Sequence, residues 1–324
     1  MQVVDSSQAL IARAVAVHAS DIFILPSPAG FEFKLRHDRQ LVVLELMTQQ
    51  EGQALINHLK YVAQMDVAEH RRPQVGACEY EIADARYALR LSSIGNFQDR
   101  ESLVIRIIYG LSESRYFLPE QFQELCALAP RRGLILTSGP TGSGKTTTMY
   151  GLAKHIGQDK LVMSIEDPVE INETNFLQVQ VNDRAEMAYE ALLKAALRHR
   201  PDVLIIGEIR DPGTARLAVD AALSGHLVLA TVHAKSTFQT IARLAGLGIS
   251  QPDLRNCLTA ISYQRLLPSA QGIACLLDIA GPARLIPALQ HPQAQAFVAW
   301  QTKLHDLFQE GMIDETTYET FQNG

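Results

Sequence analysis

A glycine-rich segment at residues 139–147 carries the residue types that bind a phosphate chain. It reads Gly-Pro-Thr-Gly-Ser-Gly-Lys-Thr-Thr and fits the pattern G-x-x-x-x-G-K-[ST] in full. Its glycines allow backbone N–H groups to point at phosphate oxygens, and the start of a following helix adds a positive dipole end. Lys145 is expected to reach the terminal phosphates, and the Thr146 hydroxyl to ligate Mg²⁺. The expected nucleotide-binding residues of this loop are Gly139, Pro140, Thr141, Gly142, Ser143, Gly144, Lys145, Thr146 and Thr147.

An acidic segment follows the loop along the chain. Residues 164–170 read Ser-Ile-Glu-Asp-Pro-Val-Glu, and Pro168 favours a turn over a helix. The turn gathers Glu166, Asp167 and Glu170 in one small region, where one carboxylate could orient or deprotonate an attacking water. A solvated acidic loop without a catalytic role is the alternative.

Two further candidates lie at the ends of apolar runs. Glu208 follows the run 203–206, in the place of a Walker B carboxylate, where Asp is usual. Because the carboxyl end of a parallel strand faces the ligand crevice, Glu208 could hold Mg²⁺ or its water shell. His226 and His233 stand at either end of the run 227–232, and His233 is expected at the crevice end, where it could sense the terminal phosphate. The alternatives are a surface glutamate and a structural histidine.

Hydrophobic patterns divide the chain into two parts. The apolar runs 133–137, 161–165, 203–206 and 227–231 alternate with helical segments such as 146–156 and 185–197. This order predicts an α/β domain with a parallel sheet covered on both faces. Before it, helical periods at 8–18 and 51–67 and strand patterns at 21–36, 78–91 and 103–108 predict a smaller α+β domain on an antiparallel sheet. The expected organisation is 1–108 for the smaller domain, 109–119 for a linker, and 120–324 for the nucleotide domain with a C-terminal helical segment.

Composition excludes several classes of protein. The chain has 324 residues, a net charge of −6 and 47% hydrophobic residues, which indicates a globular protein and argues against broad non-specific nucleic-acid binding. It has no apolar stretch of about 20 residues and no signal-peptide pattern at the N-terminus, so no transmembrane segment is expected. The four cysteines lack CxxC spacing, so reduced thiols and no zinc site are expected. A GTPase base-reading motif fails at residues 302–305, and residues 223–226 hold only a fragment of an ABC signature.

Four motifs in order resemble one family. IEDPVE at 165–170, GEIRD at 207–211 and GHLVLATVH at 225–233 follow the phosphate loop as in the motor ATPases of type II secretion and type IV pili. ASDIFILP at 19–26 looks like that family's entry strand, and SYQRLLP at 262–268 looks like its helix ending in a QRL turn. The segments 92–96 and 100–106 look most like the competence pilus assembly ATPases of Gram-positive bacteria.

The resemblance implies an architecture and a set of roles. It implies a hexamer whose subunits pair a PAS-like N-terminal domain with a RecA-like P-loop NTPase domain. The cofactors would be ATP and Mg²⁺, with Glu170 as the catalytic glutamate, Glu208 in the Walker B strand, and His226 and His233 in a histidine motif. Phosphate-contacting arginines would come from the N-terminal domain. The candidates are Arg90 and Arg106, then Arg36, with Arg198 and Arg210 in the second domain.

The resemblance also implies a cellular role. ATP hydrolysis would drive rotation between the domains and power assembly of a competence pilus for DNA uptake, without direct nucleic-acid binding. The protein would be cytoplasmic and peripheral to the membrane through an inner-membrane pilus platform protein. A pilus retraction motor, a type II secretion motor, and an ATP-gated scaffold with little turnover remain alternatives. The chain lacks the four-cysteine zinc insertion of larger assembly motors, and Arg36-His-Asp-Arg39 replaces a glycine-containing hairpin turn.

Overall fold

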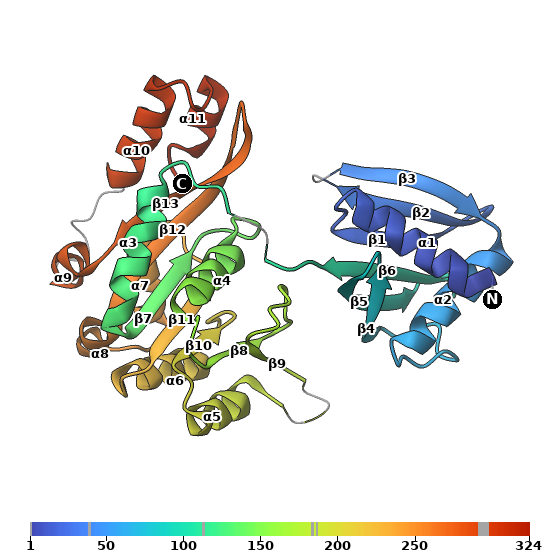
Figure 1. Ribbon diagram of the computed structural model, residues 1–324, viewed down its shortest axis with the longest axis horizontal. Coiled ribbons are helices and arrows are strands. Elements are labelled where there is room, and N and C mark those ends of the chain that lie inside the picture. Colours follow the sequence, from blue (N-terminus) through green and yellow to red (C-terminus); the bar gives the residue numbers. More distant parts are fainter. Residues whose placement is uncertain (1, 38–39, 112–113, 183–184, 186, 291–297) are drawn as a thin grey trace. The chain divides into compact units, whose positions relative to one another are not determined.

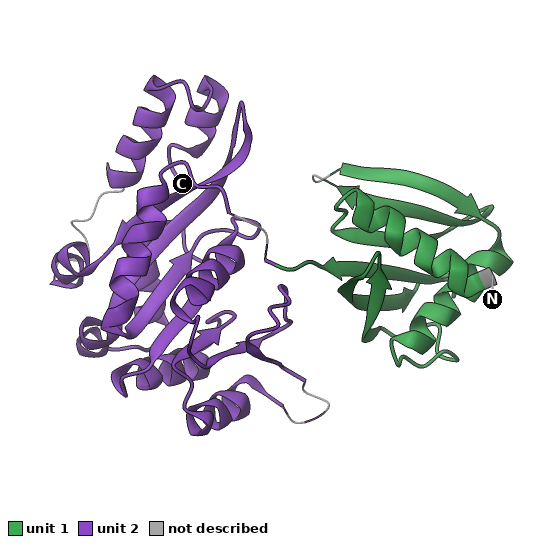
Figure 2. Ribbon diagram, in the orientation of Figure 1, with its two compact units in different colours: residues 1–110 green, residues 111–324 purple. Residues whose placement is uncertain are grey.

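The chain folds into two compact units, Met1–Gly110 and Leu111–Gly324 (Figure 2). The computed structural model describes all residues except 1, 38–39, 112–113, 183–184, 186 and 291–297. The boundary falls inside the segment 109–119, which the sequence suggests as a linker. The later part of this segment belongs to the second unit, because the Phe117 N–H donates to the Cys275 carbonyl (3.0 Å) and the Tyr116 ring stacks on Phe122. A flexible linker role for 109–119 stays a prediction.

The first unit is an antiparallel sheet packed against two helices (Figure 1). The sheet has the order β3-β2-β1-β6-β5-β4, and alternate residues of its inner strands are buried, as expected when one face packs on a core. Its core joins α1 through Ile11, α2 through Ile56 and the sheet through Phe33 and Ile105. The strands are β1 (Asp21–Ser27), β2 (Gly30–His37), β3 (Gln40–Met47), β4 (Gln74–Ile82), β5 (Ala85–Gly95) and β6 (Glu101–Ile108), and the helices are α1 (Gln2–Ala16) and α2 (Gln49–Val62).

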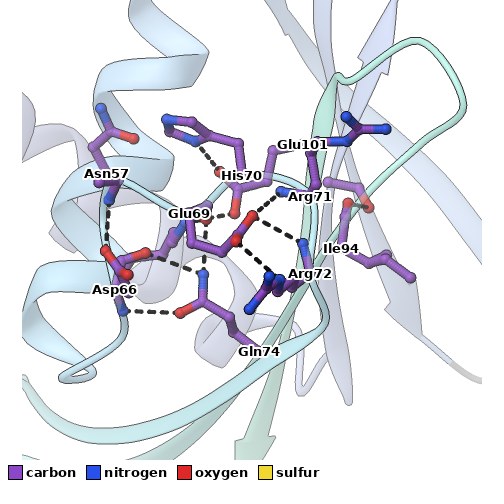
Figure 3. A network of polar contacts seen from close by, with 12 residues as sticks. Asn57, Asp66, Glu69, His70, Arg71, Arg72, Gln74, Ile94 and Glu101 are labelled. Carbon is purple, nitrogen blue, oxygen red and sulfur yellow. Dashed lines mark hydrogen bonds and ion pairs between the residues drawn. The ribbon is translucent and has the colours of Figure 1, made fainter.

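A buried ion pair ties α2 to β6 within this unit. The Lys60 ammonium lies 2.6 Å from Glu101 Oε1 and donates to the Glu69 carbonyl at 2.6 Å, while both charged side chains are almost fully buried. His70 Nδ1 lies 2.9 Å from the other Glu101 oxygen, and Gln74 bridges the same loop through the Glu69 carbonyl (Figure 3). The loop between α2 and β4 is therefore held by a polar cluster.

The second unit is built on a seven-stranded sheet in the order β13-β12-β7-β11-β10-β8-β9. All neighbouring strands are parallel except the edge pair β12–β13. This α/β arrangement agrees with the sequence expectation for the second part of the chain. The strands are β7 (Gly133–Ser138), β8 (Val162–Glu166), β9 (Leu177–Gln180), β10 (Val203–Ile206), β11 (Leu227–Val232), β12 (Leu258–Ser269) and β13 (Gly272–Ala280).

Helices cover both faces of this sheet, because successive residues of its central strands enter different cores. Leu204 packs in a core with α5, α6, α7, α8 and α9, whereas Ile205 packs in a second core with α3 and α4. This explains why the strands are apolar without alternation. The helices are α3 (Pro119–Leu128), α4 (Lys145–Ile156), α5 (Tyr189–His199), α6 (Pro212–Leu223), α7 (Thr237–Gly246), α8 (Gln251–Cys257) and α9 (Pro282–Gln290), with a 3₁₀ turn, η1 (Ala129–Arg131), after α3.

The C-terminal helices α10 (Val298–Gln309) and α11 (Glu315–Phe321) pack on the β12–β13 hairpin. Trp300 lies in this core against the edge of Tyr263, with ring centroids 5.1 Å apart. The expectation of a helix at 262–268 is wrong. These residues lie within β12, because they pair with β7 on one side and β13 on the other. No described helix is long and apolar enough to span a bilayer.

Candidate nucleotide-binding site

Most of the sequence candidates of the second unit converge at the carboxyl ends of β7, β8, β10 and β11. Parallel strands end at the same edge of a sheet, which is where ligands bind in open α/β folds. A pocket of about 430 Å³ lies there. It is lined by Thr141, Gly142, Gly144, Lys145, Thr146, Thr147, Glu166, Asp167, Pro168, Glu170, Tyr189, Gly207, Glu208, Arg210, Thr231 and His233.

The loop between β7 and α4 has a backbone that suits an anion. Gly139, Gly142 and Gly144 adopt positive φ angles of 148°, 75° and 80°. At Gly139 an added Cβ would lie 2.5 Å from the Gln264 carbonyl oxygen, so the close approach requires glycine. The Gln264 amide in turn donates to the Ser143 carbonyl at 2.6 Å and braces the loop from β12. No side chain caps α4, which leaves the first N–H groups of the helix available to a phosphate.

Lys145 lies inside this loop. Its ammonium donates to the carbonyls of Gly139 (3.0 Å) and Pro140 (2.9 Å). Burial lowers the pKa of Lys145, while the nearby carboxylates of Glu208 and Glu170 oppose that change. A buried ammonium whose hydrogen bonds go to neutral carbonyls is positioned to neutralise a phosphate.

The acidic segment is fastened along one face of α4. Three helix residues spaced four apart each contact a glutamate of the segment, and that spacing places them on a single helix face. Thr146 Oγ1 donates to Glu170 at 2.9 Å, and Lys154 Nζ lies 2.9 Å from Glu173 Oε2. Between them, the Tyr150 hydroxyl donates to Glu166. The segment 166–173 is therefore attached to α4 at three points that span two helical turns.

The carboxylates of the acidic segment have different environments. Glu166 is buried and accepts hydrogen bonds from Ser164 (2.7 Å) and Tyr150, and burial raises its pKa. Those contacts fit an anchoring role. Asp167 and Glu170 are exposed at the pocket, and Glu170 Oε2 reaches the first turn of α4 through Thr146. Of the two, Glu170 contacts a residue that the phosphate-loop pattern assigns to the metal.

Glu208 joins two cationic or protonatable side chains. Its Oε2 lies 2.7 Å from Arg210 Nε, and its Oε1 lies 3.3 Å from His233 Nε2. The other ring nitrogen of His233 lies 3.2 Å from the Gly139 carbonyl, so this histidine connects the end of β11 to the phosphate loop. His226 is at the opposite end of β11, where Nδ1 contacts the Ala221 carbonyl, and it does not line the pocket.

The residues present fit Mg²⁺ bound together with a nucleotide. Mg²⁺ uses one or two protein ligands plus phosphate oxygens and waters rather than a full protein cage. Thr146 and Glu208 both line the pocket and supply oxygen ligands of this kind. Among the described residues, no group of three or more His, Cys, Asp or Glu side chains could hold a metal ion without such phosphate or water ligands.

Of the candidate arginines, only Arg210 is among the described residues that line the pocket. Arg210 lines the pocket, whereas Arg198 lies in the last turn of α5 outside it. Arg90 and Arg106 lie opposite each other on β5 and β6 of the first unit, and Arg106 pairs with Asp21 at 2.9 Å. Arg36, on β2, stacks over the Phe23 ring. Phosphate contacts by Arg90, Arg106 and Arg36 stay predictions from the family resemblance.

Three residues that line or support the pocket escaped the sequence reasoning. Tyr189 lines the pocket and donates to the Ile165 carbonyl at 3.0 Å. Tyr150 and Gln264 hold the acidic segment and the loop from outside any phosphate motif. Tyr150 could have been found from the sequence, because it lies four residues after Thr146 and therefore on the same face of the expected helix.

The fold and this site define the class of P-loop nucleotide-binding proteins. More narrowly, the chain belongs to the family described as type II/IV secretion system proteins, which it matches over residues 2–295. It is 38% identical to the competence protein ComGA of Streptococcus pneumoniae over 97% of this chain and 96% of that protein. With ComGA of Bacillus subtilis it shares 38% identity over 82% of this chain and 76% of the relative.

Solved structures agree with this assignment. The pilus retraction motor PilT with bound ADP is 26% identical, with a TM-score of 0.77 over 97% of this chain and 96% of that chain. The ATPase DotB of Legionella pneumophila has a TM-score of 0.73 at 19% identity, covering 96% of this chain and 93% of that one, and so shows the fold alone. The predicted family membership and α/β fold are thereby confirmed.

Proposed function

We propose that this protein hydrolyses ATP at the pocket of the second unit. The observation that carries the proposal is the meeting of Lys145 and Thr146 with Glu170 and Glu208 at one sheet edge. The ADP bound to the pilus retraction motor PilT, which is 26% identical to this chain, supports the choice of an adenine nucleotide.

The geometry supports a role for each of these residues. Phosphoryl transfer requires positioning and charge neutralisation more than covalent chemistry, and bound Mg²⁺ would supply part of that neutralisation. Lys145 places its ammonium at the phosphate loop, and Thr146 and Glu208 would hold the metal. Glu170, exposed and fixed by Thr146, would orient the attacking water or accept its proton. His233 links Glu208 to the loop and would report the state of the terminal phosphate.

The cellular role that we propose is assembly of a competence pilus. The identity to two ComGA proteins, one of them matched over nearly its full length, supports this choice over the retraction and secretion alternatives. In this proposal a homo-hexamer of RecA-like and PAS-like domains converts hydrolysis into domain rotation. It acts in the cytoplasm on an inner-membrane platform protein and does not itself bind DNA.

The test is phosphate release from ATP at rising protein concentration. The wild-type chain is compared with Glu170→Gln, Lys145→Ala and the control Glu310→Gln, which changes an exposed glutamate away from the pocket. Glu170→Gln should bind ATP and lose about 10²–10⁴ in rate, and Lys145→Ala should lose ATP binding. A specific rate that rises with concentration supports sites completed between subunits. Wild-type turnover by Glu170→Gln contradicts its role, and a wild-type chain that binds ATP without turnover contradicts hydrolysis in favour of a scaffold.

A further inference from the structure

One edge of the sheet in the second unit carries many positive charges. The parallel strands β12, β7, β11, β10 and β8 lie side by side and begin at this edge, whereas the nucleotide pocket lies where strands end. The segments that lead into these strands contain six cationic side chains and two carboxylates, although the whole chain has a net charge of −6. These segments are 129–132, 157–161, 198–202, 224–226 and 255–257. We call this row the basic edge, and its cations are Arg131, Arg132, Lys160, Arg198, Arg200 and Arg255.

The cations of the basic edge are not neutralised by nearby carboxylates. All six side chains are exposed, and none forms an ion pair with another described residue. Elsewhere in the same unit, Arg284 lies 2.8 Å from a carboxylate oxygen of Asp278. A cation at a helix C-terminus complements the helix dipole, but this effect does not require a row of unpaired cations across five strands. The positive charge of the basic edge is therefore available to an external anion.

Hydrogen bonds between the segments hold the basic edge in place. Arg132 Nη1 donates to the Gly225 carbonyl at 2.9 Å, which joins the segments before β7 and β11. The Leu161 N–H donates to the Asp202 carboxylate at 3.1 Å, which joins those before β8 and β10. Four strand spacings of about 4.8 Å give the row a length of about 20 Å, which an extended peptide of about six residues would cover.

Apolar side chains accompany the charges. Leu161 and Leu223 are 42% and 43% exposed at the same edge, beside the starts of β8 and β11. At the β12 end, a hollow of about 630 Å³ lies on α8 and the last turn of α9. Arg255 is the one charged side chain among the described residues that line this hollow. A ligand that fits the basic edge therefore carries negative charges together with apolar groups.

We propose that the basic edge binds an acidic segment of a partner protein, in which Asp or Glu residues are interspersed with apolar ones. Arginine guanidinium groups bind carboxylates through paired hydrogen bonds, and five of the six cations are arginines. A phosphate polymer fits less well, because it offers nothing to the exposed leucines and the rest of this acidic chain would repel its length. This inference goes beyond the proposed function, because the nucleotide pocket lies at the other edge of the sheet.

The experiment measures binding of a defined peptide to the full chain by fluorescence anisotropy. The labelled probe has about eight residues, Glu, Leu and Ser, and its matched peptide has Gln in place of each Glu. Arg131→Glu/Arg255→Glu should weaken binding of the acidic peptide about tenfold at low salt, and Lys160→Glu about threefold. Arg255→Lys, which keeps the charge, should bind within about threefold of wild type. The matched control is Arg86→Glu, which reverses an exposed cation on β5 of the first unit and should bind within about twofold.

Each outcome supports or overturns the inference. A loss confined to the acidic peptide and to the variants of the basic edge supports it. Equal binding of the two peptides overturns it, as does wild-type affinity in Arg131→Glu/Arg255→Glu. A single-stranded oligonucleotide or a phosphatidylglycerol vesicle that binds wild type more tightly than the acidic peptide, and loses binding in the double variant, overturns it in favour of a phosphate ligand. Binding of ADP is measured separately, and a wild-type chain that binds no ADP contradicts the proposed function without affecting the peptide result.

Discussion

The ion pair between Lys60 and Glu101 allows a sharp prediction about stability. The two side chains are 0% and 1% exposed, and their charged atoms lie 2.6 Å apart. Removing one partner of such a pair leaves an uncompensated buried charge, which typically destabilises a protein by ~3–5 kcal/mol. Glu101→Gln should have this effect, because Lys60 would keep the Glu69 carbonyl at 2.6 Å but lose the carboxylate. Lys60→Met should lose less, because His70 Nδ1 still contacts the remaining Glu101 carboxylate at 2.9 Å.

The double variant Lys60→Met/Glu101→Gln completes a thermodynamic cycle. With both charges removed, the free energy of unfolding should recover part of the loss in Glu101→Gln, so the two changes should be strongly non-additive. Far-UV circular dichroism in urea measures the whole chain. Fluorescence of Trp300, the only tryptophan in the sequence, reports the second unit.

In Glu101→Gln, the urea midpoint measured by circular dichroism should fall, because the first unit is destabilised. The urea midpoint measured by tryptophan fluorescence should stay unchanged, because Trp300 lies in the second unit. The exposed pair Arg71–Asp99 in the same region provides the control, because Asp99→Asn should change stability by under about 1 kcal/mol. A loss below about 1 kcal/mol in Glu101→Gln, or additive single changes, would refute the reasoning.

Three further predictions concern buried groups. Glu166→Gln should be more stable than wild type, and the difference should grow as the pH rises above about 4.5. Burial raises the pKa of Glu166, so the wild-type protein loses stability as this buried carboxyl becomes charged. A difference in thermal midpoint that stays constant between pH 5 and pH 8 contradicts this. Tyr150→Phe should lose ~1–3 kcal/mol in urea unfolding by leaving a buried carboxylate oxygen short of a donor, and a neutral effect would count against the anchor. Burial raises the pKa of Cys126 to about 11 and of Cys275 to about 12, so native alkylation by iodoacetamide at pH 8 should be at least about 100-fold slower than in urea; comparable rates would contradict it.

Local patterns in the sequence were sufficient for the phosphate loop and the central strands. The motif G-x-x-x-x-G-K-[ST] specifies backbone geometry directly. A short, continuous apolar run such as 203–206, between helical segments, indicates a strand covered on both faces. The meeting of Glu170, Glu208 and His233 followed from one rule, that parallel strands end at the same edge.

Sequence patterns failed where contacts between distant parts of the chain determine the secondary structure or the role of a residue. β3 has exposed Val42, Val43 and Leu46 and no clear alternation of burial, so its sequence does not reveal which face packs. The helix at 262–268 was expected from the family resemblance alone. Burial of β12 on both faces removes the two-residue period that would have indicated a strand, and its partner β7 is distant in sequence. The different roles of Glu166 and Glu170 depend on Tyr150 and Ser164, which no carboxylate motif contains.

The three contacts between α4 and the acidic segment have a mechanical consequence. Three residues of α4, one helical turn apart, each bind one glutamate of the segment 166–173. Thr146 binds Glu170, Tyr150 binds Glu166 and Lys154 binds Glu173, so the segment is attached to the helix that begins at the phosphate loop. We therefore expect Glu170 to move together with the phosphate loop and not independently of it. We expect the timing of hydrolysis to depend on groups outside α4 and the segment 166–173. We also expect a displacement of this segment to move α4, and with it the phosphate loop.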